Sequence, residues 1–320
     1  MQANSSEGIL ISICMPTYNN AQRFAQVLRS FAIQNLEGVE LLIRDDSTSH
    51  DTKNIVEKYP NLPIRYFSGE KEGFDEAVLF LTKQAKGEYV WWFGDDLLES
   101  GAVENLKNVL KKYPELVFVW LNSGEAENPD YTAIKIKDDR FFKDRNEIIE
   151  IDIGLLAFMT STVVKRSCII PFLTGAPKYK KSQLISFSLV MGLLSSTEGS
   201  YYFVSHPYIL GNAKPAGEVR WYDQFQVWCV NIFNVAQDFK NKFSARSLKI
   251  AFSKQLRQVI KAIIVERSLG LKTGFATDSP KIIPMLRLYW AYWEAWFAVP
   301  LLLSPRSILK FFYWGYKKFR

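Results

Sequence analysis

Tyr89-Val-Trp-Trp-Phe-Gly-Asp-Asp96 is the stretch of sequence that decides the fold. Five bulky apolar residues in a row predict a strand that is buried on both faces of a sheet. In open α/β sheets, ligands bind just beyond the carboxyl ends of the strands, which is where Asp95 and Asp96 fall. Two adjacent carboxylates repel each other, and a divalent cation such as Mg²⁺ or Mn²⁺ relieves that repulsion. The alternative is that Asp95 caps a helix that begins near Leu98 while Asp96 is solvated.

Strands and helices alternate on both sides of this stretch. Apolar segments predict strands at 9–15, 39–44, 63–67 and 89–93. Periodic segments predict helices at 21–35, 74–86 and 98–113, and a further helix follows the polar residues 45–52 and ends near Tyr59. This alternation predicts an α/β fold with a mostly parallel, doubly wound sheet. Further along we expect strands at 116–121, 160–165 and 201–204, helices at 148–158 and 184–194, an irregular segment at 123–136 and a loop at 208–219.

The composition is typical of a globular protein with one large domain and a smaller appendage. Of 320 residues, 48% are hydrophobic and 23% are charged. Cys14, Cys168 and Cys229 are far apart, which excludes metal-site spacing and a disulfide framework and favours a reducing compartment. Residues 1–8 lack the features of a signal peptide. We therefore expect a flexible terminus at 1–8 and a cytoplasmic location.

Polar residues follow the first four predicted strands, so they are expected to meet in one crevice. Pro16 and Thr17 expose backbone groups, and Tyr18 offers a stacking surface. Asp46 is placed to accept the imide or amino N–H of a pyrimidine. The helix that begins after Gly73 presents an N-terminus that favours a phosphate. Together with a metal site, these features describe a nucleoside-diphosphate pocket, although each has a structural alternative: Pro16 ends a strand, Asp46 caps a helix and Gly73 forms a turn.

Three motifs in this order resemble the family 2 glycosyltransferases of GT-A fold. They are Ile-Cys-Met-Pro-Thr-Tyr-Asn-Asn, Leu-Leu-Ile-Arg-Asp-Asp-Ser-Thr-Ser-His-Asp-Thr and Gly-Glu-Tyr-Val-Trp-Trp-Phe-Gly-Asp-Asp. The Phe-Gly-Asp-Asp ending is similar to the abequosyltransferase-like members that build bacterial surface polysaccharides such as O-antigen. The resemblance covers about 9–115 and is looser over 155–215.

The resemblance implies an inverting, metal-dependent transfer of a sugar from a nucleoside-diphosphate sugar to an acceptor hydroxyl. It implies a GT-A domain at 9–215, with a nucleotide-sugar-binding half at 9–120 and an acceptor-side half at 121–215, before a helical region at 216–320. Asp96 is the implied metal ligand, Mn²⁺ or Mg²⁺, within an Asp95–Asp96 pair that acts as a DXD-like motif. The implied nucleotide-sugar contacts are Pro16, Thr17, Tyr18, Asn19, Asp46, Gly73, Asp75 and Asp95.

The general base is the point at which the sequence departs from the family pattern. Family members often carry an acidic residue at the start of the helix after the acceptor-side strand, where this chain has Ser182 and Gln183. A glutamine amide donates and accepts hydrogen bonds but does not take up a proton at neutral pH. Other candidates for the base are Glu198, Glu218 and Asp223, and His206 is either a diphosphate contact or a structural residue. A catalytically silent nucleotide-sugar-binding or scaffold subunit of a glycan assembly complex is therefore the alternative function.

The C-terminal region is basic and aromatic. Residues 240–320 contain 16 Lys/Arg and three Asp/Glu, whereas the rest of the chain is slightly acidic. The apolar segment 286–303 is interrupted by Glu294 and Pro300 and is shorter than the roughly 20 residues of a spanning helix. We expect this region to lie on the anionic inner face of the plasma membrane, near a lipid-linked glycan acceptor, and we expect no nucleic-acid partner. The alternative is a helical subdomain whose aromatic residues pack on the body or on a second subunit.

Overall fold

The computed structural model describes residues 8–128, 130–196, 198–211, 222–271, 274–275 and 281–318. The expected flexible terminus falls, apart from Gly8, outside these residues. The chain forms two compact units, which are described one at a time. The first contains Met1–Arg145 and Leu156–Ala213, and the second contains Asn146–Leu155 and Lys214–Arg320. The second unit thus takes in a short segment that the sequence-based division placed in the acceptor-side half.

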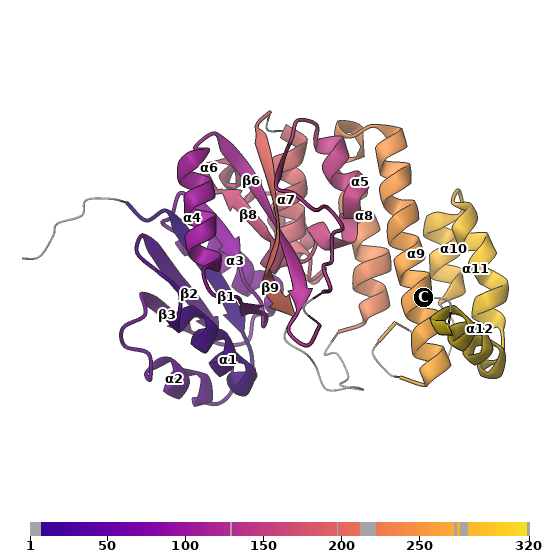
Figure 1. Cartoon of the computed structure of the whole chain (residues 1–320), viewed down its shortest axis with the longest axis horizontal. Helices are drawn as coiled ribbons and strands as arrows, with labels where there is room; N and C mark the ends of the chain where they lie inside the picture. Colours follow the sequence, from indigo (N-terminus) through magenta and orange to yellow (C-terminus); the bar gives the residue numbers. More distant parts are fainter. Residues whose placement is uncertain are drawn as a thin grey trace, which may run out of the picture. The chain divides into compact units, whose positions relative to one another are not determined.

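The first unit is built on one sheet with the strand order β3-β2-β1-β4-β8-β6-β9-β5, with β7 paired to β9 (Figure 1). The strands are β1 (Ile11–Thr17), β2 (Val39–Asp45), β3 (Ile64–Ser68), β4 (Tyr89–Trp92), β5 (Leu97–Leu98), β6 (Leu116–Glu125), β7 (Arg140–Phe142), β8 (Thr162–Lys165) and β9 (Ser200–Gly211).

The sheet is mixed, so the prediction of a mostly parallel sheet is wrong for its second half. Strands β3, β2, β1 and β4 are parallel as predicted, and β9 is parallel to β6. Strand β8 lies between β4 and β6 and is antiparallel to both, and β5 and β7 are antiparallel to β9. The physical reason is that β8 starts at the carboxyl edge of β4, since Trp91 pairs with Val163 and Tyr89 with Lys165. A strand that enters a sheet at that edge runs against its neighbours.

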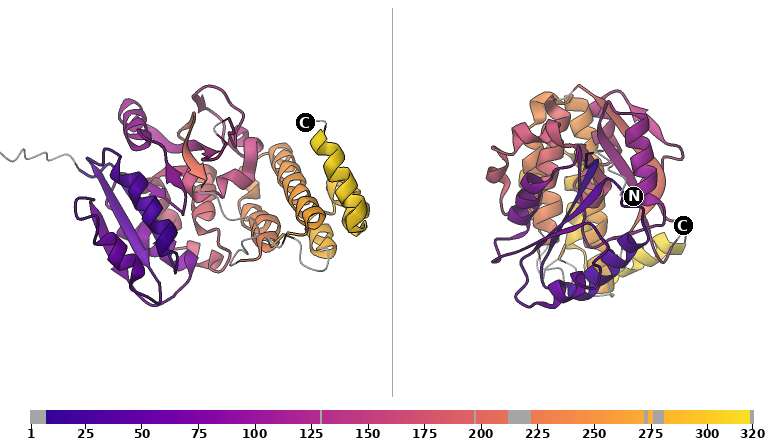
Figure 2. Two further views of the ribbon diagram at one scale, coloured as in Figure 1. Left: turned by 60° about the horizontal axis from the view of Figure 1, so that its bottom comes forward. Right: turned by 90° about the vertical axis from the view of Figure 1, so that its left-hand side faces the viewer.

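Helices cover both faces of this sheet (Figure 2). The main ones are α1 (Ala21–Ala32), α2 (Asp51–Val56), α3 (Phe74–Gln84), α4 (Ala102–Lys112) and α7 (Ile185–Ser196). The apolar stripes of α1 and α4 share one buried cluster with alternate residues of β1, β2 and β4, among them Ile13 and Trp91. On the opposite face the Trp92 Nε1–H donates to Thr82 Oγ1 of α3 at 2.8 Å. The alternation of Trp91 and Trp92 between two helical layers explains why this strand is apolar throughout.

The segment after Asp96 differs from the prediction. Helix α4 begins at Ala102 after Gly101, which has a φ of +80°, and not near Leu98. Leu97 and Leu98 instead form β5, which pairs with β9. The expected loop at 208–219 is therefore strand up to Gly211, and its remainder lies outside the described residues. The expected irregular segment at 123–136 begins later for the same reason, because β6 follows β9 as far as Glu125. The interpretation of Asp95 as a cap for a helix near Leu98 is wrong.

The second unit is helical. It contains α8 (Ile232–Gln237), α9 (Ala245–Leu269), α10 (Ile282–Tyr289), α11 (Trp293–Leu303), α12 (Arg306–Lys318) and most of α5 (Arg145–Leu156). Helix α9 begins after Ser244, whose side chain accepts from the N–H of Ser247, and ends at the left-handed Gly270. Helix α5 is interrupted at Asp152, whose carboxylate accepts from the N–H of Leu155 and so caps its second part.

The charge within the apolar segment 286–303 is neutralised internally. Glu294 of α11 is buried and accepts two hydrogen bonds from Arg257 of α9, at 2.9 and 3.1 Å. A buried carboxylate requires such a partner, which accounts for a glutamate in an otherwise apolar helix. Within the described ranges, no helix combines the length and the apolar content needed to cross a membrane.

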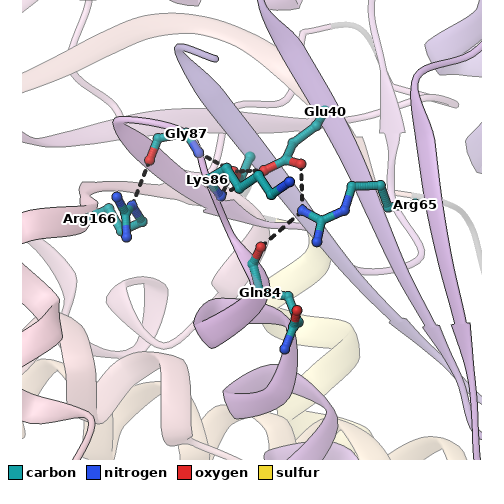
Figure 3. Close-up of polar contacts among 7 residues, drawn as sticks. Glu40, Arg65, Gln84, Lys86, Gly87 and Arg166 are labelled. Atoms are coloured by element: carbon teal, nitrogen blue, oxygen red, sulfur yellow. Dashed lines mark hydrogen bonds and ion pairs between the residues drawn. The ribbon is translucent and has the colours of Figure 1, made fainter. Parts of the chain in front are cut away.

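A buried polar network joins the first strands at the edge of the sheet where they begin (Figure 3). Glu40 of β2 accepts from Ser12 Oγ of β1 at 2.6 Å, from Arg65 Nη1 of β3 at 2.8 Å and from the N–H of Lys86 at 2.7 Å. Arg65 also donates to the carbonyl of Gln84. Burial alone would raise the pKa of Glu40, but these hydrogen bonds and the charge of Arg65 together lower it. The network thus stabilises the ionised carboxylate and links three strands to the end of α3.

We expect Glu40→Ala to lower the free energy of unfolding by about 2–4 kcal/mol, because Arg65 and the N–H of Lys86 lose a buried acceptor. Urea unfolding followed by circular dichroism measures this change. The exposed Glu57→Ala, which removes a surface contact with Lys53, is the control and should change the free energy of unfolding by less than about 0.5 kcal/mol.

The pH dependence of this effect follows from the lowered pKa of Glu40. A carboxyl group whose pKa is lower in the folded state stabilises the fold above its unfolded pKa, and this contribution is lost as the pH falls through the folded pKa. The difference between wild type and Glu40→Ala should therefore be complete at neutral pH and shrink under acidic conditions. An equal difference at all pH values would show that the ionised form has no special role.

Candidate active site

Four loops meet at the carboxyl edge of the parallel strands. Because β3, β2, β1 and β4 are neighbours and run in the same direction, the residues that follow them lie along one edge. This edge carries every nucleotide and metal position predicted from the first half of the chain: Pro16, Thr17, Tyr18, Asn19, Asp46, Gly73, Asp75, Asp95 and Asp96. The structure therefore brings these loops together as predicted, while the contacts of each side chain with a ligand stay predictions.

The loops after β1 and β2 are bound to each other. Asn19 has a positive φ of 46° and its N–H donates to Ser47 Oγ at 2.8 Å. Its side-chain oxygen accepts from the N–H of Thr48 at 3.0 Å, and the N–H of Asp46 donates to the carbonyl of Thr17 at 3.1 Å. An asparagine tolerates this left-handed conformation better than most residues. Asn19 thus holds the predicted nucleoside loop in place, and its partners Ser47 and Thr48 were not singled out from the sequence.

Asp46 is buried and ion-paired. Its Oδ1 accepts from Arg44 Nε at 2.6 Å, and the Arg44 guanidinium lies 4.9 Å from the centre of the Phe80 ring. Gly69 passes so close to this guanidinium that a Cβ at that position would lie 2.3 Å from it. Arg44 therefore fixes the orientation of Asp46, and a nucleobase N–H would have to use the other carboxylate oxygen.

Tyr18 is half-exposed at the same rim and carries a cation on its ring. Lys71 Nζ lies 4.1 Å from the ring centre. A cation over an aromatic face at this distance is an attractive contact. Lys71, which follows β3, adds a positive charge close to the predicted stacking surface, and sequence motifs alone did not indicate it.

Asp75 connects the two halves of the first unit. It is buried at the start of α3 and accepts from the backbone N–H groups of Gln183 at 2.8 Å and Ile185 at 3.2 Å. Burial raises the pKa of Asp75, although these backbone donors oppose the rise. Asp75 thus caps the start of α7 from another helix, a contact that its predicted role as a lining of the nucleoside pocket did not include.

The contact with Asp75 brings the predicted acceptor-side residues to the carboxyl edge. Gln183 has a φ of +61° and Lys181 a φ of +69°, both unusual for residues other than glycine. The side-chain Oε1 of Gln183 is buried and has no hydrogen-bond partner among the described residues. Ser182 Oγ accepts from the N–H of Leu184 at 3.0 Å. Both the left-handed backbone and the unsatisfied amide oxygen cost free energy, so the turn depends on its surroundings, among them Asp75, to hold it.

The Asp95–Asp96 pair follows β4 with one member partly exposed and one buried. Asp95 Oδ2 lies 3.4 Å from Arg23 Nη1 of α1. Asp96 Oδ2 accepts from Thr160 Oγ1 at 2.6 Å, a residue that the sequence placed only within a strand. Carboxylate oxygens are the ligands that Mg²⁺ and Mn²⁺ prefer.

The pair fits a metal that is shared with a substrate. Over the described part of the chain, no group of three or more His, Cys, Asp or Glu side chains is arranged to hold a metal ion. Mg²⁺ in phosphate-transfer sites is commonly bound through one or two carboxylates plus substrate phosphates. The donor set of Asp95 and Asp96 suits that arrangement.

The candidates for the general base fall in different places. Glu198 is exposed just before β9, which starts at the edge where β4 also starts, and so lies away from the Asp95–Asp96 edge. Asp223 lies in the second unit, in an ion pair with Lys281, and Glu218 lies outside the described residues. Glu198, the described candidate within the first unit, is therefore not placed at the edge that carries Gln183.

His206 of β9 makes a hydrogen bond with Glu99. Its Nε2 lies 2.5 Å from Oε2 of Glu99, and its ring packs edge-on against Tyr208 at 4.3 Å between ring centres. Glu99 directly follows β5, whose pairing with β9 is reinforced by the backbone bond from Glu99 to Tyr208. These contacts support the structural role for His206 over a diphosphate contact.

Comparisons with known proteins agree with this geometry. Residues 12–166 match the family model described as glycosyl transferase family 2. The chain is 27% identical over 183 residues to an uncharacterized glycosyltransferase of Rickettsia typhi, covering 56% of this chain and 54% of that protein. It is 26% identical over 178 residues to abequosyltransferase RfbV of Salmonella typhimurium, covering 49% and 53%. The chain thus spans about half the length of these relatives.

A solved structure shares the fold. The crystal structure of S. aureus TarS 1–349 in complex with UDP matches with a TM-score of 0.59 and 16% identity, covering 82% of this chain and 75% of that one. At this identity the likeness concerns the fold, a mixed α/β sheet of the GT-A type with helices. The family match and the relatives therefore show that residues 12–166 of this chain form a glycosyl transferase family 2 domain.

Proposed function

We propose that this protein is a metal-dependent glycosyltransferase that moves a sugar from a nucleoside-diphosphate sugar to a hydroxyl of a glycan acceptor in bacterial polysaccharide synthesis. The observation that carries the proposal is the convergence of a nucleoside loop, a helix N-terminus and the Asp95–Asp96 pair along the carboxyl edge of β1 to β4. The family 2 domain, the likeness to an abequosyltransferase and the UDP complex of TarS support the same class of donor.

In this proposal, Tyr18 stacks on the nucleobase and Asp46 accepts its N–H through the oxygen that Arg44 does not use. Because Arg44 holds the Asp46 carboxylate in one orientation, the contact with the nucleobase is expected to select a base that presents an N–H in that direction. The start of α3 after Gly73 faces the same edge and suits a phosphate. The pyrimidine nucleotides are the expected donors, since an imide or amino N–H is what a carboxylate accepts.

Asp96, with Asp95, would hold the cation against the diphosphate. A bound cation neutralises the negative charge that develops on the departing nucleoside diphosphate. An acceptor hydroxyl that attacks the anomeric carbon from the face opposite this leaving group inverts its configuration. In this proposal Gln183, whose backbone N–H donates to Asp75, would accept a hydrogen bond from that hydroxyl through Oε1, which has no partner among the described residues.

The proton of the acceptor hydroxyl must reach a group other than Gln183, because an amide does not take it up. Glutamine at position 183, in place of an acidic residue, also favours the second candidate function. That function is a catalytically silent member that binds nucleotide-sugar or serves as a scaffold in a glycan assembly complex. The two functions differ in one measurable property: both bind a nucleotide, but only the first releases nucleoside diphosphate in the presence of acceptor.

The acceptor is proposed to be lipid-linked, and the second unit is proposed to bind the cytoplasmic face of the plasma membrane. Helices α10 to α12 and the turns between them expose a set of large apolar side chains, which would be costly to leave in water. They are Ile283, Trp290, Trp293, Trp296, Phe297, Leu303, Ile308, Phe311 and Trp314. Tryptophan is enriched at membrane interfaces.

The charges around these side chains favour an anionic lipid surface. Arg287, Arg306 and Lys310 are exposed on the same three helices, and Glu294, the acidic residue of these helices, is buried in its pair with Arg257. A basic, aromatic surface without exposed carboxylates is attracted to an anionic leaflet and anchored by its apolar groups.

Thermal unfolding with UDP, CDP, GDP or dTDP, each with and without Mn²⁺, tests the donor site. We expect one nucleotide to raise the melting temperature more with Mn²⁺ than without it, because a ligand that binds the folded state alone stabilises it. Asp96→Asn should abolish the Mn²⁺-dependent part of the shift. The exposed Glu57→Gln, far along the chain from the pair, is the control and should keep it. The absence of a shift with every nucleotide in the wild type would overturn the donor-site proposal.

Sedimentation with vesicles tests the membrane proposal. We expect binding to vesicles that contain phosphatidylglycerol and much weaker binding to phosphatidylcholine alone. The triple change Trp293→Ser, Phe297→Ser and Phe311→Ser should weaken binding at least ~10-fold, since each buried aromatic side chain contributes on the order of 1.5–3 kcal/mol.

Ile33→Ser is the matched control for this experiment, because it removes an equally exposed apolar side chain from the first unit. It should leave vesicle binding unchanged. The proposal would be overturned if the wild type did not bind anionic vesicles but formed dimers, and the triple change dissociated them. That result would show that these side chains bind a second copy of the protein.

A further inference from the structure

Thr160 bonds both to Asp96, the buried member of the Asp95–Asp96 pair, and to Gly94, which follows β4. The Thr160 hydroxyl donates to Asp96 Oδ2 at 2.6 Å and accepts from the backbone N–H of Gly94 at 3.1 Å. A hydroxyl has one proton to donate and lone pairs to accept, so both bonds are made at once. Thr160 has no exposed surface, and Asp96 is 8% exposed. The pair therefore makes a hydrogen bond shielded from water.

Thr160 is itself held rigidly. It lies in the short 3-10 turn η1 (Met159–Ser161), and its carbonyl accepts from Trp91 Nε1 of β4 at 2.7 Å. The Ser161 hydroxyl donates to the carbonyl of Phe158 at 2.8 Å, and the Thr162 hydroxyl donates to the carbonyl of Met159 at 3.0 Å. These bonds leave the turn little freedom, so the position of the Thr160 hydroxyl is set by β4 and η1 together.

Gly94 allows this close approach. A Cβ at position 94 would lie 3.3 Å from Thr160 Oγ1 and 3.5 Å from Asp96 Oδ2. The absence of a side chain at Gly94 leaves its N–H accessible to the hydroxyl. The glycine of the Phe-Gly-Asp-Asp ending therefore has a structural reason in this chain, namely the contact between β4 and η1.

We propose that Thr160 is a positioning residue that orients the Asp96 carboxylate for the divalent cation. The inference rests on the proposed metal-dependent function. The hydroxyl holds Oδ2 and so limits the directions in which Oδ1 would face a bound cation. A carboxylate oriented in advance binds a metal more tightly, because ordering it on binding costs free energy. A bound cation would also restrict rotation of the Asp96 carboxylate, so the Thr160 hydrogen bond and the cation would order the same group.

Mn²⁺ titration in the presence of UDP, CDP, GDP or dTDP, followed by the electron paramagnetic resonance signal of free Mn²⁺, tests this role. We expect Thr160→Val to weaken Mn²⁺ binding by ~10–100-fold, as the loss of an outer partner of a ligand typically does. Thr160→Ser keeps the hydroxyl and should restore binding to within about 3-fold of the wild type. Nucleotide binding without Mn²⁺ should be the same in all three proteins.

Thr162→Val is the matched control, because it removes another fully buried threonine hydroxyl two residues away, which donates to the carbonyl of Met159. It should leave Mn²⁺ affinity unchanged. If Thr160→Val does not fold, Gly94→Ala tests the same contact, since its Cβ would lie 3.3 Å from Thr160 Oγ1, close enough to displace the hydroxyl by a few tenths of an ångström without removing it. It should weaken Mn²⁺ binding in a protein with a native circular dichroism spectrum.

The outcomes separate this inference from the function on which it rests. Wild-type protein that binds no Mn²⁺ with any nucleotide would overturn both. Wild-type binding that Thr160→Val and Gly94→Ala leave intact would overturn only the role of Thr160. A lower melting temperature in Thr160→Val with unchanged Mn²⁺ affinity would assign the residue to stability alone.

Discussion

The pairing of β1 with β4 is the contact on which the candidate active site depends. Their register, from Ile11 opposite Tyr89 to Cys14 opposite Trp92, sets how far the Asp95–Asp96 pair lies along the edge relative to the loop after β1. Gly87 makes this register possible, because a Cβ there would lie 2.6 Å from the backbone nitrogen of Ser12. Its N–H donates to Ser12 Oγ, which in turn donates to Glu40. The packing around Gly87 at one edge of the sheet therefore sets the position of the Asp95–Asp96 pair at the other edge.

The first half of the fold was predictable from the sequence because its signals are local. Each strand of β1 to β4 is a short apolar segment followed by polar residues, and parallel order follows from the intervening helices. The antiparallel strands were not predictable in the same way. The place of β8 between β4 and β6, and of the two-residue β5 on β9, depends on pairings between residues that are 42 to 113 positions apart, which no local pattern encodes.

In the candidate site, too, the residues with local sequence signals were predictable and those that depend on long-range contacts were not. Motifs indicated Asp46, Asp95 and Asp96 because carboxylates after strands have a recognisable spacing. Their supporting residues could not be found this way, since the partner of Asp96 is Thr160, 64 positions later, and the partner of Asp75 is Gln183, 108 positions later. Arg44 was the exception, as it lies two positions from Asp46, but a strand arginine carries no motif of its own.

Asp75 shows why a supporting residue at this edge is not simply a stabilising one. Burial raises the pKa of its carboxyl group, so the ionised form is less favourable in the fold than in the unfolded chain, and backbone N–H groups offset only part of that cost. Glu40, at the opposite edge, has the reverse balance: its partners lower its pKa, and its charge stabilises the sheet. A buried charge that costs stability while it holds a strained turn in place is better explained by the position of that turn than by the stability of the fold. The turn contains Gln183, so Asp75 fixes the position of the residue that is predicted to lie on the acceptor side. The two halves of the first unit therefore meet through a buried carboxylate, at the edge of the sheet that also carries the residues predicted to bind the donor.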